Sequence, residues 1–130
     1  MRPKSIAEIA ERAADAPGSF DRAAREFIDH WQLSAPDDHA AALAQEPRGL
    51  NHLQDAYLGA LAEHLALSDR IPAPAWSEQP HRFLTEPFFA GGGLESLKAT
   101  LLVESPLAFR RRLIFISANG LSRPHHREPA

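Results

Sequence analysis

The sequence contains no cysteine, which excludes disulfides, a thiolate nucleophile and cysteine-ligated zinc, and fits a reducing compartment. It has no run of about 18 apolar residues, and residues 1–17 mix acidic with apolar side chains, so neither a membrane span nor a secretion signal is expected. An excess of positive charge is also missing, because 14 Lys and Arg face 17 Asp and Glu, for a net charge of -3. A general nucleic-acid binder, which needs basic residues to displace counterions from phosphates, is therefore not favoured. We expect a cytoplasmic protein.

The residues that are present predict one small helical domain. With 130 residues, of which 44% are hydrophobic, the chain can bury a core. Ser5 and Glu8 form a capping box before a first helix that ends at residues 16–18, and Ser19 precedes a second, amphipathic helix. Residues 39–46 predict a brief third helix, and residues 50–67 a longer fourth one. Apolar stripes of the second and fourth helices predict a single core, formed by Phe20, Phe27, Trp31, Leu53, Tyr57 and Leu61.

The second half of the chain is less regular. Residues 71–80 contain three prolines and cannot form a regular helix, so we expect them to wrap around the bundle, anchored by aromatic residues such as Trp76 and Phe83. Gly91, Gly92 and Gly93 mark a hinge before a helix over residues 94–103. Ser105 is predicted to cap a short helix, and residues 113–117 to form a strand that ends at a turn over residues 119–120. The predicted fold is mostly α, a small helical bundle with a proline-rich irregular segment and a short C-terminal strand or hairpin, over residues 1–122, followed by a flexible tail over 123–130.

Candidate catalytic and metal sites are weak. His52, Asp55 and Glu63 share a side of the fourth helix and His39 follows two aspartates, but no HExxH or Glu-x-x-His pair occurs, so we predict no metal site and no cofactor. His64 is interpreted as a core histidine, and His125 and His126 lie in the predicted tail. The glycines at 91–93 lack the lysine and hydroxyl residue of a phosphate-binding loop, and Ser96 and Ser105 lie outside any G-x-S-x-G motif. No catalytic residue is predicted.

Three consecutive arginines, Arg110 to Arg112, are the most informative feature. They project in three directions from a helical turn whose buried side would carry Phe109 and Leu113. One interpretation is a charged helix end that complements the dipole and pairs with acids such as Glu104. The alternative is a partner surface, because arginine suits planar carboxylate and phosphate contacts.

Residues 74–76, PAW, 83–89, FLTEPFF, and 101–117, LLVESPLAFRRRLIFIS, together resemble a segment of small uncharacterised bacterial proteins. Some of those proteins carry the segment beside a helix-turn-helix module or in toxin–antitoxin-type gene pairs. The resemblance brings no catalytic residues with it and implies contact with another protein. The N-terminal helices here show no helix-turn-helix signature, which weakens the DNA-binding version.

We therefore predict a non-catalytic protein-interaction module, an antitoxin-like or regulatory partner subunit. Its partner would be a toxin or an enzyme, and a second copy of the chain is an alternative. The predicted contact residues are Phe109, Arg110, Arg111, Arg112, Ile114 and Ile116. A first alternative is a transcriptional regulator or nucleic-acid-binding module that uses the triplet with Arg123 and Arg127. A small hydrolase or transferase with an unrecognised site is the second.

Overall fold

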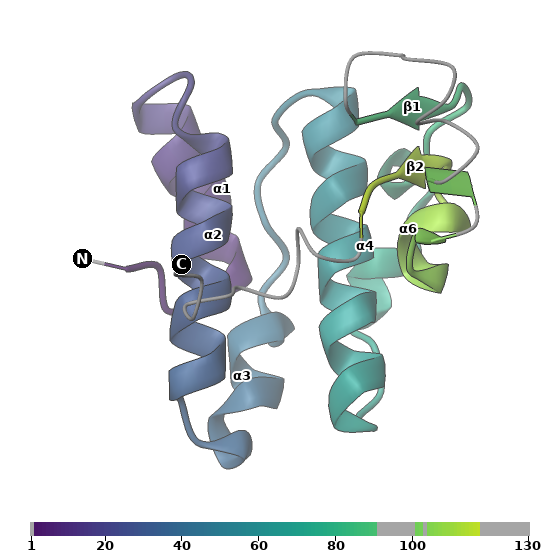
Figure 1. Cartoon of the computed structure of the whole chain (residues 1–130). Helices are drawn as coiled ribbons and strands as arrows, with labels where there is room; N and C mark the ends of the chain where they lie inside the picture. The colour runs from purple at the N-terminus through teal and green to yellow at the C-terminus, as the bar shows by residue number, and fades with distance from the viewer. Residues whose placement is uncertain (1, 91–100, 103, 118–130) are drawn as a thin grey trace, which may run out of the picture.

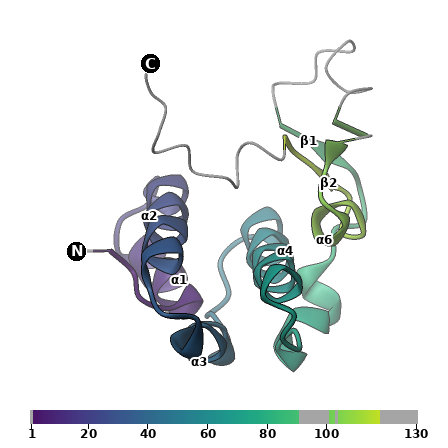
Figure 2. The ribbon, with the colours of Figure 1, turned by 60° about the horizontal axis from the view of Figure 1, so that its bottom comes forward.

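A computed structural model describes residues 2–90, 101–102 and 104–117, and the fold is mostly helical, as predicted. Figures 1 and 2 show two groups of elements side by side. The first group holds α1 (Ile6–Asp15), α2 (Phe20–Leu33), the short 3₁₀ helix η1 (Pro36–Asp38) and α3 (His39–Ala44). The second is built on the long helix α4 (His52–Asp69). In the described ranges no helix is both long enough and apolar enough to cross a lipid bilayer.

Polar side chains at the helix ends explain where the main helices begin. Ser5 accepts a hydrogen bond from the Glu8 backbone N–H at 3.3 Å, which confirms the predicted cap of α1. Asn51 caps α4 in the same way, by accepting from the Gln54 N–H at 2.8 Å. Ser19 precedes α2, as predicted, and stands at its cap position, but its hydroxyl donates to the Arg12 carbonyl at 3.2 Å and makes no capping bond. This bond holds the turn between α1 and α2.

The predicted core exists and joins the two groups. Phe20, Phe27, Trp31 and Leu61 are buried in it, and Leu53 and Tyr57 pack against it while partly exposed. Phe20 of α2 contacts Tyr57 of α4 edge to face, with ring centroids 5.6 Å apart. Such aromatic pairs are favourable beyond the area that they bury. This pair defines one end of the seam between α2 and α4.

Residues 71–90 wrap around α4, as the prolines indicated. The segment includes the 3₁₀ turns η2 (Ala75–Glu78) and η3 (Pro80–Arg82), and Trp76 anchors it in the core. The Trp76 indole N–H donates to the carbonyl oxygen of Leu43 in α3 at 3.0 Å. An irregular segment is therefore held to both groups through one buried side chain.

The predicted short C-terminal strand is confirmed, and its surroundings differ from the prediction in their details. β1 (Phe88–Phe89) and β2 (Ile114–Phe115) form a parallel pair, whereas a hairpin would be antiparallel, and α6 (Leu107–Arg110) precedes β2. Pro106 stands at the cap position of α6, and Ser105 does not cap it. The Ser105 hydroxyl instead accepts from the Ile116 N–H at 2.9 Å and lies 2.5 Å from the Leu101 carbonyl oxygen. The predicted glycine hinge, the turn over residues 119–120, the tail and most of the predicted helix over 94–103 lie outside the described residues.

Candidate functional site

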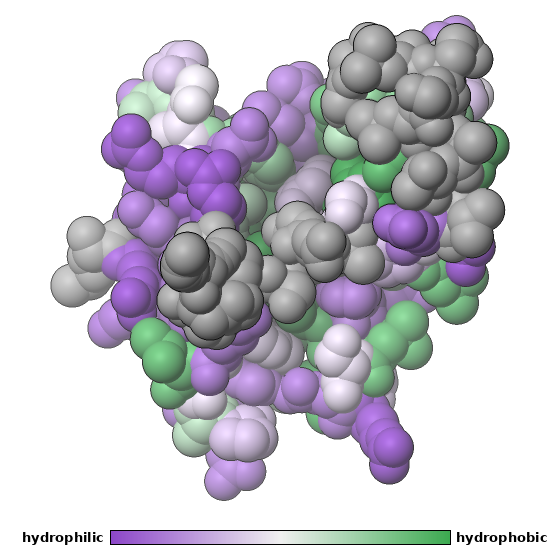
Figure 3. Space-filling view, in the orientation of Figure 1, coloured by the Kyte–Doolittle hydropathy of each residue, from purple (hydrophilic) through white to green (hydrophobic). Residues whose placement is uncertain are grey.

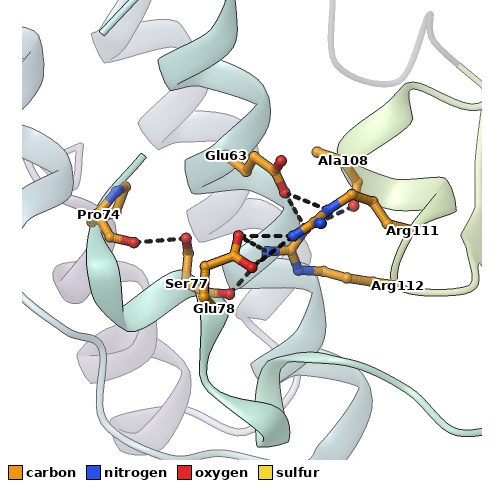
Figure 4. Close-up of polar contacts among 7 residues, drawn as sticks. All are labelled: Glu63, Pro74, Ser77, Glu78, Ala108, Arg111 and Arg112. Carbon is orange, nitrogen blue, oxygen red and sulfur yellow. Dashed lines mark hydrogen bonds and ion pairs between the residues drawn. The ribbon is translucent and has the colours of Figure 1, made fainter. Parts of the chain in front are cut away.

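The arginine triplet separates into three environments, as its helical spacing predicted, and Figure 4 shows those of Arg111 and Arg112. Arg110 is exposed, and its guanidinium has no hydrogen-bond or ion-pair partner within the described part of the chain. The Arg111 side chain is 35% exposed and the Arg112 side chain is fully buried. The three residues therefore do not form one charged surface.

Arg112 is an interior residue whose two terminal nitrogens each donate to at least one acceptor, while its buried Nε has no hydrogen-bond partner among the described residues. Nη1 donates to Glu63 of α4 at 2.5 Å and to the Ala108 carbonyl at 2.9 Å, and Nη2 donates to the Ser77 carbonyl at 2.8 Å. Its guanidinium carbon lies 4.4 Å from the ring centroid of Phe83. Burial lowers the pKa of Arg112, and the Glu63 carboxylate opposes that shift. Arg112 thus ties α4, η2 and α6 together.

Arg111 forms an ion-pair network on the surface beside it. Its Nη2 donates to both carboxylate oxygens of Glu78 at 2.8 Å, and its Nε donates to Glu63 at 3.2 Å. Slight burial lowers the pKa of Arg111, but the hydrogen bond that Arg111 donates to Glu78 and the charge of Glu63 raise it overall. The acid expected to pair with the triplet was Glu104. Partners distant in sequence, Glu63 and Glu78, take that role.

A second buried arginine was not predicted. Arg82 of η3 is fully buried, and it donates to the Pro47 carbonyl at 3.0 Å and to the Asp55 carbonyl at 3.2 Å. Gly59 of α4 makes room for both arginines: a Cβ placed there would lie 2.9 Å from the Arg82 Cβ and 3.3 Å from the Arg112 Nε. Glycine is therefore required at this point of α4 by close approach, not by backbone conformation.

Half of the predicted contact residues prove to be internal. Phe109, Arg112 and Ile114 are fully buried in the chain's own core, so they do not form the contact surface that was predicted. The physical reason is Leu113, whose φ of 64° ends the helical turn in the left-handed region. Arg112, three residues after Phe109, then takes the buried position that was expected for Leu113. Arg110, Arg111 and Ile116 remain at least partly exposed.

The strand β2 does not offer another protein an open edge at Ile116. β1 pairs with one edge of β2, with hydrogen bonds from Phe88 N–H to the Leu113 carbonyl and from Ala90 N–H to the Phe115 carbonyl. On the other side the Ile116 N–H is held by the Ser105 hydroxyl. A strand covered in this way is protected from edge-to-edge pairing. Strand addition at β2 is therefore not the mode of contact that the geometry favours.

An apolar groove lies where Ile116 meets the seam between the two groups. It has a volume of about 420 Å³, and its walls come from the first part of α2, from α4 and from the residues at the ends of β1 and β2. Phe88 is 38% exposed beside it. In Figure 3 apolar residues show in the depression between the two groups, with polar residues on either side. The lining residues are Phe20, Asp21, Leu53, Gln54, Tyr57, Phe88, Ala90 and Ile116.

The groove has few polar lining residues, namely Asp21, Gln54 and Tyr57. Burial, and secondly the charge of Asp21, raise the pKa of Tyr57 to about 12, while Arg25 acts in the opposite direction. The Tyr57 hydroxyl is therefore a hydrogen-bond donor throughout the physiological range. Asp21 is exposed, and its carboxylate has no hydrogen-bond or ion-pair partner among the described residues. An apolar cavity with a few polar groups is the usual form of a binding pocket.

One histidine has the outline of a hydrolase triad. His39 is 7% exposed, its Nδ1 is hydrogen-bonded to the Asp69 carboxylate, and its Nε2 lies 3.1 Å from the Ser34 hydroxyl. Nε2 also lies 2.9 Å from the Trp31 carbonyl, which can only accept, so this nitrogen must carry a proton to bond there. A general base needs that nitrogen free of a proton, and the Ser34 hydroxyl already donates to the same carbonyl at 2.9 Å. With its ring stacked on Trp31, His39 is a structural link between α2, α3 and α4.

The other candidate residues also have local roles. Glu63 binds Arg111 and Arg112, and Asp55 accepts from the Leu50 N–H at 2.7 Å. Within the described ranges no three His, Asp or Glu side chains converge as metal ligands would. His64 is partly buried against Phe109, with ring centroids 6.1 Å apart, and burial lowers its pKa. None of these residues lines the groove.

Comparison of the chain with protein-family models, curated proteins and solved structures found no match.

Proposed function

We propose that this protein is a non-catalytic protein-interaction module, an antitoxin-like or regulatory partner subunit, and that its partner docks in the groove between α2, α4 and the β1–β2 pair. The observation that carries the proposal is the groove itself. Phe88 keeps 38% of its surface exposed there, although the same chain buries large side chains elsewhere as completely as Phe27 and Phe109. Aromatic side chains with exposed surface in a concave apolar site are frequent anchors of protein interfaces.

The charges support a protein partner over a nucleic acid. Phosphate binding needs arginines that are free to contact the backbone of the nucleic acid. Arg111 and Arg112 are instead engaged by Glu63 and Glu78, and only Arg110 of the triplet has no such engagement within the described residues. Arg123 and Arg127 lie outside the described residues. The proposal therefore keeps Ile116 as a contact residue and adds Phe88.

The test starts with capture of the partner from the source organism and its identification by mass spectrometry. Binding of the purified partner is then measured by calorimetry for the parent chain and for two variants. Phe88→Ala removes a ring that is 38% exposed in the groove, whereas Leu33→Ala removes an apolar side chain that is 73% exposed at the far end of α2. We expect F88A to weaken binding roughly tenfold or more and L33A to leave it unchanged.

Thermal melts of both variants provide the control, because affinities can be compared only between variants that remain folded at the temperature of the binding measurement. Equal affinity of the partner for F88A and for the parent chain would contradict the proposal. A captured nucleic acid whose binding falls steeply with salt would favour the regulator alternative instead. Capture of a protein without the F88A effect is not support, because it places no contact in the groove.

A further inference from the structure

We infer that the groove is built for a segment of the partner that carries a large apolar side chain followed closely by an arginine or lysine. The inference rests on the proposed function and specifies the chemistry of the occupant. It follows from the position of one carboxylate, Asp21, at the rim of a groove whose other walls are almost entirely apolar.

Many acidic side chains elsewhere in the described structure have partners, whereas exposed acids such as Asp37 have none among the described residues. Glu11 pairs with Arg48, Glu26 with Arg12, Glu46 with Arg82, Glu63 and Glu78 with Arg111, and Asp69 with His39. Asp21 has no partner within 4 Å among the described residues, although Arg25 lies one turn further along α2. A charge at the edge of an apolar pocket selects an occupant of opposite charge and steers its approach.

Asp21 also has a plain structural role, because it lies in the first turn of α2, where a carboxylate interacts favourably with the helix dipole. That role accounts for an acid at this position in any helix. It does not account for the placement of the acid against the groove, nor for the two further polar groups beside it. Tyr57 and Gln54 also line the groove, and their side chains are of a kind that hydrogen-bonds to the backbone of a bound segment.

The size of the groove limits the occupant. A volume of about 420 Å³ accommodates one or two large apolar side chains and not a whole amphipathic helix. A bound segment would thus place one anchor among Phe20, Tyr57 and Phe88 and its cationic residue next to Asp21. The apolar anchor would supply most of the binding free energy, and the cationic residue would determine which sequences the groove prefers.

The test is a selection of random 12-residue peptides displayed on phage against three forms of the full-length protein: the parent, Asp21→Asn and Asp37→Asn. Asp37 is an exposed acid on η1, beyond the far end of α2, so D37N is a matched control for the loss of one negative charge. From the parent and from D37N we expect peptides with a large apolar residue and, within about four positions, Arg or Lys, because a groove of this size spans only a few residues of a bound segment. From D21N the cation should disappear while the apolar residue remains.

Binding of synthetic copies of the enriched peptides then measures how much Asp21 contributes to the affinity. We expect them to bind D21N roughly three- to tenfold more weakly than D37N, and to lose binding to F88A. Peptides without a cation, equal affinity for D21N and D37N, or no enrichment at all would overturn the inference. If the natural partner needs Phe88 while the peptides show no preference for a cation, only this inference fails; if the partner ignores Phe88, the proposed function fails too.

Discussion

Alanine substitution at each of the three adjacent arginines should give sharply graded losses of stability, because the structure places identical side chains in three environments. Arg112 is fully buried, and its removal takes from the Ser77 and Ala108 carbonyls a donor that lies within 2.9 Å of each. It also takes from the Glu63 carboxylate its nearer donor, at 2.5 Å, and leaves it only the Arg111 Nε at 3.2 Å. Breaking a buried charged pair by removing one member costs about 3–5 kcal/mol. The lost contact with the Phe83 ring adds roughly 0.5–2 kcal/mol.

Substitution of the two neighbouring arginines, Arg111 and Arg110, should lower the free energy of unfolding much less. Arg111 is 35% exposed and paired with Glu78, which is itself 54% exposed, so its loss should cost about 0.2–1 kcal/mol, as is usual for surface ion pairs. Arg110 has no partner in the described structure, and its replacement should stay within about 0.5 kcal/mol of the parent. All three variants lose the same charge, so a general electrostatic effect cannot produce the gradient.

The assay is urea unfolding of purified variants, followed by the fluorescence of Trp31 and Trp76, which lie in the two groups of elements. The order of the midpoints should be Arg110→Ala, then Arg111→Ala, then Arg112→Ala far below. If Arg112→Ala unfolds within about 1 kcal/mol of Arg110→Ala, the placement of Arg112 in the core is wrong.

Four further predictions follow from other parts of the structure. Phe27→Ala should lose about 3–5 kcal/mol in the same urea assay, since Phe27 is fully buried; a parent-like midpoint would mean that the ring is exposed. Gly59→Ala should destabilise despite a helix propensity gain of about 1 kcal/mol, because the added Cβ meets Arg82 at 2.9 Å, and a stabilised variant would contradict that close approach. Tyr57, with a pKa raised to about 12 by burial and by Asp21, should titrate above the ordinary value of 10.0 when followed by tyrosinate absorbance, so stability falls as pH rises between these values; half-ionisation near 10 in folded protein would refute this. Elemental analysis of untagged, dialysed protein should find no stoichiometric transition metal, and one equivalent of zinc, iron or manganese would oppose the non-catalytic proposal.

The sequence was sufficient for elements whose signals are local. The stripe that contains Phe27 and Trp31, the cap at Ser5 and the proline-rich wrap anchored by Trp76 all appear where they were predicted. Each depends on spacing or on chemistry within a few residues, which a single sequence displays. The core therefore followed from helical periodicity alone.

The buried arginines could not be predicted in that way. Arg112 is stable inside the core because Glu63 and the Ser77 carbonyl, 49 and 35 residues away in the chain, meet its guanidinium. No local pattern reveals such partners, and an arginine without them would belong on the surface. The i, i+3 spacing of Phe109 and Arg112 was the available signal, but the left-handed residue Leu113 that makes it decisive is not a residue type expected there.

The groove was missed for the same reason. Its walls combine the start of α2, the face of α4 and the ends of two strands, and β1 was not predicted because Phe88 and Phe89 pair with a strand 26 residues later. Of the lining residues, Ile116 alone was predicted to contact a partner, whereas Phe20, Leu53 and Tyr57 were predicted only as core residues. The apolar neighbours of Ile116 are brought to it only by the tertiary fold.

Tyr57 provides the most direct test of whether the partner docks in the groove, because it is the one tyrosine of the sequence and it lines the groove. The chain is produced with ¹³C-labelled tyrosine, and its single set of ring signals is followed by NMR while the unlabelled purified partner is added. We predict that the ring signals of Tyr57 shift and saturate with the same affinity that calorimetry gives, and that Phe88→Ala weakens both together. Ring signals that stay unchanged when the partner is fully bound would show that the partner docks elsewhere, and would contradict the account.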